Sequence, residues 1–148
     1  MKLENYKDYR NYSVKIYDIQ MSMSVLSWDR ETKMPKNGSK FRAQQLTTLA
    51  KIAYELSIDN DYGKLLEKLS NDDSLNSDEK RNLYLSRKIF LKNKKYTTEF
   101  IVKQSKLISK AFNDWRIATD KNDYKVFQDS LEKLVDLTRD ECELLGYD

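Results

Sequence analysis

The chain has 148 residues, the length of one domain, and its 27 basic and 24 acidic residues give a net charge of +3. It contains no histidine, which excludes a zinc site built on paired histidines and any hydrolase that needs a histidine base. Helix-forming residues are abundant, whereas three glycines and one proline allow few tight turns. The composition therefore predicts one mostly helical domain over residues 1–148.

No run of 18 apolar residues is present, and the polar first ten residues lack the apolar segment of a signal peptide. The single cysteine, Cys142, cannot form an internal disulfide, which is consistent with a reducing compartment. Because Cys142 follows Thr138 at helical spacing, we expect it to be a small buried hydrophobe. These features predict a cytoplasmic protein without a membrane segment.

Apolar residues spaced by three or four predict the first two helices. The first is expected over residues 3–27, with one apolar stripe along it. The stripe consists of Tyr9, Tyr12, Ile16, Ile19, Met23 and Leu26. Pro35 and the Asn-Gly pair that follows interrupt the spacing, so residues 28–37 are expected to form an irregular link. The second helix is expected to begin near Ser39.

Side chains that can cap a helix predict the starts of four more. They are Asp59, Asn76 with Glu79, Thr97 or Thr98, and the pair Asn122–Asp123. The polar run 70–77 is expected to be a flexible loop, and no segment shows the alternation typical of a strand. The predicted fold is an all-α bundle of five to six helices.

Two motifs stand out from this helical background. The first is W-D-x-x-T-x-M-P-x-x-G followed by R-x-x-Q-L-x-x-L, formed by Trp28, Asp29, Thr32, Met34, Pro35, Gly38, Arg42 and Gln45. The second lies downstream and includes Trp115, Asp123, Phe127 and Arg139, and residues 145–147, just before the last residue, read Leu-Gly-Tyr. Together these patterns resemble the N-terminal part of the thermostable, Taq-type zinc metallocarboxypeptidases.

The resemblance implies a parent enzyme that removes C-terminal residues from peptides, with zinc or cobalt bound at an H-E-x-x-H helix. Because this chain has no histidine, we expect it to carry no catalytic or metal-binding residue of its own and to be inactive alone. It would be the N-terminal helical region of a larger helical metallopeptidase fold, forming a wall or lid over the cleft beside the catalytic remainder. The alternative is a stand-alone helical interaction module that retains the scaffold without the enzyme.

The motif residues also have plain structural explanations. Trp28 and Trp115 are expected to be core aromatics, and the less favoured alternative is a wall of the substrate channel. Asp29 and Thr32 are expected to brace the bend, with Arg42 paired to Asp29 or Glu31. Direct contact with a peptide substrate is the minority interpretation.

Other ligand classes find little support. Asp59-Asn60-Asp61 starts like a calcium loop but lacks its glycine and glutamate spacing. Four cations, Arg81, Lys88, Lys92 and Lys95, fall on one side of the fourth helix. No nucleic-acid-binding motif accompanies them, so we expect a solvated face rather than a nucleic-acid site.

Self-association is expected because a region that packs against a larger body carries apolar surface meant for that body. The first helix offers Tyr6, Tyr9, Tyr12, Tyr17 and Met21. Residues 80–110 are mainly basic and residues 112–148 mainly acidic, which favours a two-fold arrangement with opposite charges in contact. A homo-oligomer with the first helix in its interface is the prediction.

Overall fold

The structure is a computed structural model that describes residues 5–147, without the side chain of Lys36. Within this part the chain forms six α-helices and one short 3₁₀ turn, and no strand. The helices are α1 (Tyr6–Thr32), α2 (Ser39–Ser57), α3 (Asn60–Ser70), α4 (Ser77–Asn93), α5 (Thr98–Lys121) and α6 (Lys125–Leu145), and the 3₁₀ turn η1 is Lys36–Gly38. The predicted all-α class is confirmed. None of the helices within residues 5–147 combines the length and apolar character needed to cross a membrane.

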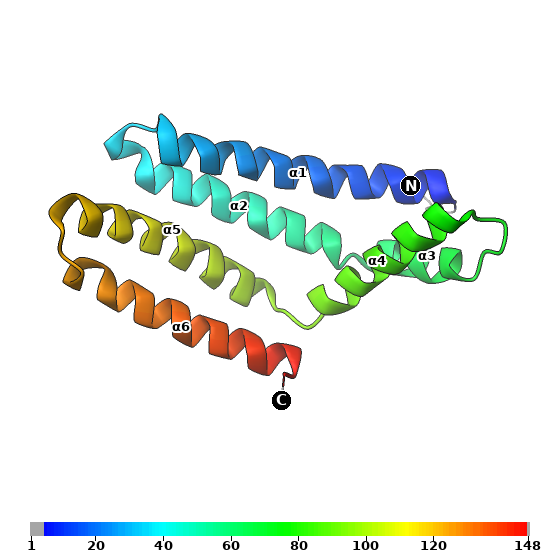
Figure 1. Cartoon of the computed structure of the whole chain (residues 1–148). Coiled ribbons are helices and arrows are strands. Elements are labelled where there is room, and N and C mark those ends of the chain that lie inside the picture. Colours follow the sequence, from blue (N-terminus) through cyan, green and yellow to red (C-terminus); the bar gives the residue numbers. More distant parts are fainter. Residues whose placement is uncertain (1–4, 148) are drawn as a thin grey trace.

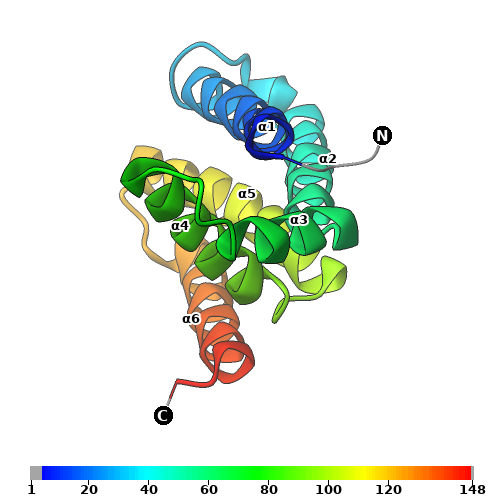
Figure 2. The same ribbon diagram turned by 90° about the vertical axis from the view of Figure 1, so that its right-hand side faces the viewer.

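Four helices lie side by side in one row, in the order α1, α2, α5, α6, and each runs antiparallel to its neighbour (Figure 1). The shorter helices α3 and α4 form a pair at one end of the row, where α3 also contacts α1 (Figure 2). A row of helices has two broad faces, so each helix can bury only the sides that meet its neighbours.

Side-chain caps fix where several helices begin. Asp59 Oδ1 accepts hydrogen bonds from the backbone nitrogens of Asp61 and Tyr62, both at 2.9 Å, and starts α3. Asn76 and Glu79 form a capping box at the start of α4. Thr97 caps α5 through the backbone nitrogen of Phe100 at 3.1 Å. These three predicted starts are confirmed, since each cap satisfies backbone N–H groups that have no partner within the helix.

The predicted irregular link over residues 28–37 is wrong for its first half. α1 continues to Thr32, and the backbone nitrogens of Lys33 and Met34 both donate to the carbonyl of Asp29 at 2.9 Å. Pro35 disfavours helical backbone only at the residue before it, so the preceding turn of helix is unaffected. The connection that remains is short and leads directly into η1 and α2. The predicted start at Leu3 lies outside the described residues.

The main apolar cluster joins the first half of α1 to α3 and α4. Leu65, Leu66 and Leu83 are each 1% exposed at its centre. Around them pack Tyr9, Tyr62, Leu69 and Phe90, with Tyr6, Tyr12, Ile16 and Leu75 at the edge. The ring of Tyr12 stacks on that of Tyr62 with centroids 4.6 Å apart. The predicted stripe of α1 faces this cluster and α2, because all six of its residues are buried or half-buried.

Three predictions of burial are wrong. Trp28 is 60% exposed, Trp115 is 49% exposed, and Cys142 is also exposed. The row explains these exposures. α1 stands at the edge of the row, so the side that carries Trp28 has no neighbouring helix. α5 buries the sides facing α2 and α6 and leaves Trp115 on an open face, and α6 packs mainly on α5 through Ser130 and Leu137, which leaves Cys142 exposed. Across the described residues 14 apolar residues are buried while 18 large apolar side chains are exposed, so the row leaves much apolar surface uncovered.

Candidate functional site at the α1–α2 corner

The first motif forms the corner where α1 turns into α2. Arg42, in the first turns of α2, reaches back to α1 and pairs with Asp29, its Nη1 2.6 Å from Asp29 Oδ2. The same nitrogen donates to the carbonyl of Leu26 at 2.7 Å, and Arg42 Nε donates to Gln45 Oε1 at 2.9 Å. The predicted pairing of Arg42 with Asp29 is confirmed. Two of these charge-assisted hydrogen bonds cross to α1 and fix the angle between the two helices, while the one to Gln45 orients the guanidinium within α2.

The remaining motif residues shape the chain between the helices. Thr32 Oγ1 donates to the carbonyl of Trp28 at 2.8 Å, within the last turn of α1. The backbone nitrogen of Gly38 donates to the carbonyl of Pro35 at 2.8 Å and closes η1. A Cβ atom on Gly38 would lie 3.1 Å from Met34 Cγ, so the missing side chain leaves room for the methionine. The first motif is therefore a structural unit that sets the corner, and its Trp28 is exposed.

A shallow hollow opens beside the corner, between the end of α1 and α5. It has a volume of about 460 Å³ and is lined by Glu31, Phe112, Trp115, Arg116, Thr119 and Asp120. The guanidinium of Arg30 lies over the Phe112 ring, 4.3 Å from its centroid. Burial lowers the pKa of Arg30, and the nearby Arg42 adds to this while Glu31 opposes it. Sequence analysis did not single out Arg30, although its position next to the motif residue Asp29 could have drawn attention to it.

Only part of the second motif lies at the end of the molecule that carries the α1–α2 corner. The α5–α6 turn lies at the same end as the α1–α2 corner (Figure 1), and there Asp123 Oδ1 accepts from the backbone nitrogen of Lys125 at 3.0 Å. Phe127 is half-buried on α6. Arg139 pairs with Asp136 at 3.0 Å on the exposed side of α6, far along the helix from the turn. Asp123 and Arg139 therefore act on their own helix, and the structure does not gather the motif residues into one cluster.

A polar cluster between α5 and α6, centred on the buried Ser130, was missed by sequence analysis. Ser130 is 0% exposed and its hydroxyl donates to Asp114 Oδ2 at 2.5 Å, while Lys110 Nζ donates to both Asp114 and the Ser130 hydroxyl. The hydrogen bond to Asp114 raises the pKa of Lys110. Burial opposes ionisation of Asp114, but hydrogen bonds from Lys110 and Ser130 outweigh it and lower its pKa. A protonated lysine cannot serve as a base and the serine is inaccessible, so the cluster joins two helices rather than performing nucleophilic chemistry.

The described residues do not fit a catalytic metal site. Within residues 5–147 no three Asp, Glu or Cys side chains are placed to hold one ion, and the sequence has no histidine. A hydrolytic zinc needs three fixed protein ligands and one open position. No metal-dependent step can therefore be assigned to the side chains of this part of the chain.

The geometry agrees with comparisons of the whole sequence. The family model for carboxypeptidase Taq (M32) metallopeptidases matches residues 8–148. The chain belongs to this family. Thermostable carboxypeptidase 1 of Pyrococcus furiosus is 30% identical over 134 residues, which make up 90% of this chain and 27% of that protein. Carboxypeptidase 1 of Bacillus subtilis is 27% identical over 149 residues, or 99% of this chain and 30% of that protein.

Solved carboxypeptidase structures share the arrangement of the helices. The crystal structure of BsuCP matches with a TM-score of 0.92 at 26% identity, covering 97% of this chain and 29% of that one. Pyrococcus furiosus carboxypeptidase matches with a TM-score of 0.75 at 28% identity, covering 100% of this chain and 30% of that one. The chain thus spans about three tenths of the length of the Taq-type carboxypeptidases it matches.

Proposed function

We propose that this chain is the N-terminal helical region of a metal-dependent carboxypeptidase that removes C-terminal residues from peptides. It forms a wall or lid over the substrate cleft and is inactive by itself. The catalytic remainder of the enzyme, corresponding to the rest of the relatives' length, supplies the ligands for zinc or cobalt. The working compartment is the cytoplasm. Membership of a metallopeptidase family supports the reaction class, and the geometry of α1 supports the structural role.

The observation that carries the proposal is a second apolar stripe on α1, opposite the buried one. Its members are Val14, Tyr17, Met21, Val25 and Trp28, which are between 41% and 63% exposed. Val25 follows the inward-facing Met23 by two residues, or about 200° around a helix. A helix that is apolar on two opposite sides belongs in the interior of a larger body, because each stripe needs a partner. We call this set the outer stripe of α1.

The outer stripe ends at the motif corner, and we infer that the corner positions this end of the stripe. The contacts of Arg42 with Asp29 and Leu26 fix the direction of α1 relative to α2. Trp28 stands at the end of the outer stripe, and Trp115 is exposed beside the hollow next to the corner. In the proposed enzyme these two rings contact the catalytic remainder or line the cleft, and the corner holds them in place.

A chimera tests the proposal. The matching stretch of Bacillus subtilis carboxypeptidase 1 is replaced by this chain, and release of the C-terminal residue from an N-blocked dipeptide is measured with zinc or cobalt. We expect the chimera to hydrolyse the peptide and the 148-residue chain alone to leave it intact. Trp28→Ala in the chimera should lower activity, whereas Tyr84→Ala, which removes a ring of similar exposure on α4, should not.

Two outcomes would contradict the proposal. One is a chimera that folds and binds metal but does not hydrolyse the peptide; this would favour a stand-alone interaction module. The other is metal-dependent hydrolysis by the purified 148-residue chain alone.

Without a partner for the outer stripe, the isolated chain should associate with itself. The contact surface predicted on the first helix from the sequence is partly wrong. Tyr9 is buried, and Tyr6 and Tyr12 pack on the main cluster. Of the five residues predicted there, only Tyr17 and Met21 are exposed. The outer stripe replaces that predicted surface as the proposed contact of a homo-oligomer. Opposite charges on residues 80–110 and 112–148 favour a two-fold arrangement through those groups that are not already paired within the chain, as Lys103 is with Asp140 at 2.8 Å.

A further inference from the structure

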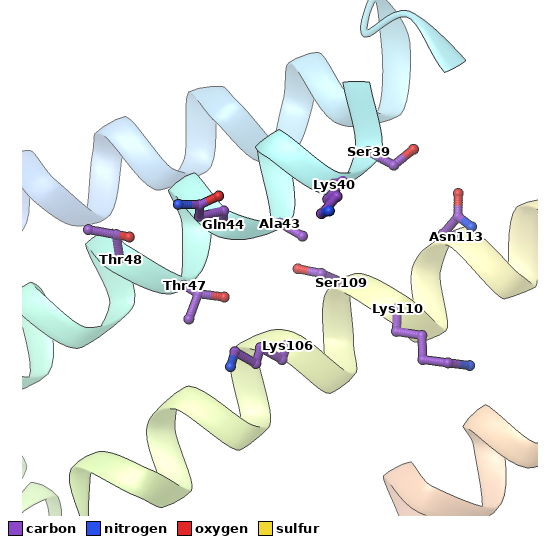
Figure 3. Close-up of a pocket in the computed structure, with 10 residues that line it drawn as sticks. All are labelled: Ser39, Lys40, Ala43, Gln44, Thr47, Thr48, Lys106, Ser109, Lys110 and Asn113. Atoms are coloured by element: carbon purple, nitrogen blue, oxygen red, sulfur yellow. The ribbon is translucent and has the colours of Figure 1, made fainter. Parts of the chain in front are cut away.

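A groove lies between α2 and α5 (Figure 3), and none of its lining residues belongs to the first motif. It has a volume of about 420 Å³. Six of its lining residues matter here: Lys40, Ala43 and Thr47 from α2, and Lys106, Ser109 and Lys110 from α5. Figure 3 shows both helices contributing side chains that project into the space between them. Neither the family resemblance nor the predicted motifs account for this groove.

The charge in the groove is positive and unbalanced. Lys110 is paired with Asp114, and Figure 3 shows its side chain directed toward α6. Lys40 and Lys106 make no ion pair or hydrogen bond with any described residue, and both are exposed. No carboxylate is among the residues that line the groove. Two free ammonium groups with no acidic neighbour in the lining create a local positive potential that favours an anion.

The hydroxyl of Ser109 adds a directional donor. Ser109 is only 9% exposed, its side chain projects into the space between α2 and α5 (Figure 3), and it makes no hydrogen bond with any described residue. The hydroxyl of Ser109 is therefore available to donate to a ligand in the groove. A carboxylate or phosphate oxygen placed there would accept from the serine and from an ammonium group together.

The rest of the groove has the chemistry of an apolar wall. Ala43, the methyl group of Thr47 and the alkyl stem of Lys106 lie along it. At one end α2 begins without a side-chain cap and without an acidic residue in its first turn, which adds positive potential from the helix dipole. Such a site suits a small molecule with an oxyanion group and an apolar body.

We propose that the α2–α5 groove is a binding site for small organic anions, in which Lys40, Lys106 and Ser109 hold the carboxylate or phosphate group. The apolar body of the ligand lies along Ala43 and Thr47. This site is independent of the proposed carboxypeptidase function, since no residue of the motif contributes to it.

Titration of the 148-residue chain at low salt tests the site, with amide chemical shifts as the readout. The probes are N-benzoylglycine, its neutral analogue N-benzoylglycinamide, and inorganic phosphate. We expect N-benzoylglycine to shift the amides of Ala43, Thr47 and Ser109, and the neutral analogue to bind at least about tenfold more weakly. Phosphate binding as tightly as N-benzoylglycine would indicate recognition of the oxyanion alone, and weaker phosphate binding at the same amides would show that the apolar body contributes.

Matched variants separate the groove from general surface charge. Lys40→Gln with Lys106→Gln should weaken binding by about tenfold, and Ser109→Ala by about threefold. Lys88→Gln with Lys92→Gln removes the same charge from α4 and should leave the affinity within about twofold. The proposal is overturned if the neutral analogue binds equally well, if the α4 control weakens binding as much as the groove variant, or if no probe shifts the groove amides. Circular dichroism of each variant checks that the helices remain intact.

Discussion

The ring of Phe90 occupies the space that a side chain on Gly63 would need. A Cβ atom on Gly63 would lie 2.4 Å from Phe90 Cζ and 3.0 Å from its Cε1. Gly63 is in the second turn of α3 and Phe90 is in the last turn of α4, so the glycine lets these two helices approach closely enough to bury Leu66 and Leu83 between them and α1.

Gly63→Ala should therefore destabilise the chain although alanine favours a helix. Replacing glycine by alanine gains about 1 kcal/mol of helix propensity. The new Cβ atom would lie 2.4 Å from Phe90 Cζ, so the ring must move, and forcing a ring out of a packed position costs about 1–3 kcal/mol. We expect a net loss of about 1 kcal/mol in the free energy of unfolding by urea. Adding Phe90→Leu should recover part of the loss that Gly63→Ala causes; equal losses in both backgrounds would show that the ring is not responsible.

Replacing Arg42 should loosen the corner between α1 and α2. Arg42→Ala removes hydrogen bonds to Asp29, Leu26 and Gln45 and leaves the Asp29 carboxylate without its partner, so we expect a loss of about 2 kcal/mol. Arg42→Lys keeps the charge but lacks the planar guanidinium, so it should retain only part of the stability that Arg42→Ala loses. Lys51→Ala breaks the exposed pair with Glu55 and should change stability by less than about 0.5 kcal/mol. A similar loss in both alanine variants would contradict the role of the corner.

Stability should fall at alkaline pH partly through Tyr12. Burial, helped by the charge of Asp59, raises the pKa of Tyr12 from 10.0 to about 12. The folded state thus favours the protonated phenol, and this contribution is complete below pH 10 and is lost as pH rises toward 12. Tyr12→Phe should make the decline in unfolding free energy over this range shallower. Phenolate absorbance follows the ionisation of tyrosine, and circular dichroism follows unfolding at each pH. Tyr84→Phe, at an exposed ring, is the control. An unchanged pH dependence in Tyr12→Phe would show that Tyr12 does not cause the decline.

The isolated chain should associate through the outer stripe of α1. Val25 is 63% exposed in the second half of α1, so Val25→Glu places a charge in the proposed contact and should yield a monomer by light scattering at micromolar concentration. Leu91→Glu makes the same kind of change at a 51% exposed position on α4 and should leave the oligomer intact. A wild-type chain that is monomeric and binds no apolar dye would contradict the prediction.

Sequence patterns predicted the features that depend on neighbours along the chain. Caps such as Asp59 and Asn76 act within one turn, and the inward stripe of α1 follows from helical spacing, so both could be identified without a structure. The sequence patterns within each helix did not predict which helices pack against one another. Trp28 and Trp115 are apolar residues at helical spacing, but a row of helices leaves them on open faces.

In the candidate sites, too, contacts between residues close in sequence were predictable and contacts between distant segments were not. The pairing of Arg42 with Asp29 was predictable because one motif carries both residues across a single turn. The contact of Arg30 with Phe112 and the groove of Lys40, Lys106 and Ser109 join segments more than 60 residues apart, and no spacing along the chain indicates such contacts.

The arrangement of the helices in a row also bears on how the molecule opens. α6 packs mainly on α5, whereas α1, α3 and α4 share the main apolar cluster. Detaching α6 breaks the cluster of Lys110, Asp114 and Ser130 but leaves the packing around Leu65 intact. Amide protons of α6 should consequently exchange with solvent through local opening, while those of α3 exchange only when the whole chain unfolds. The protein would then behave as two cooperative units of unequal stability joined by α5.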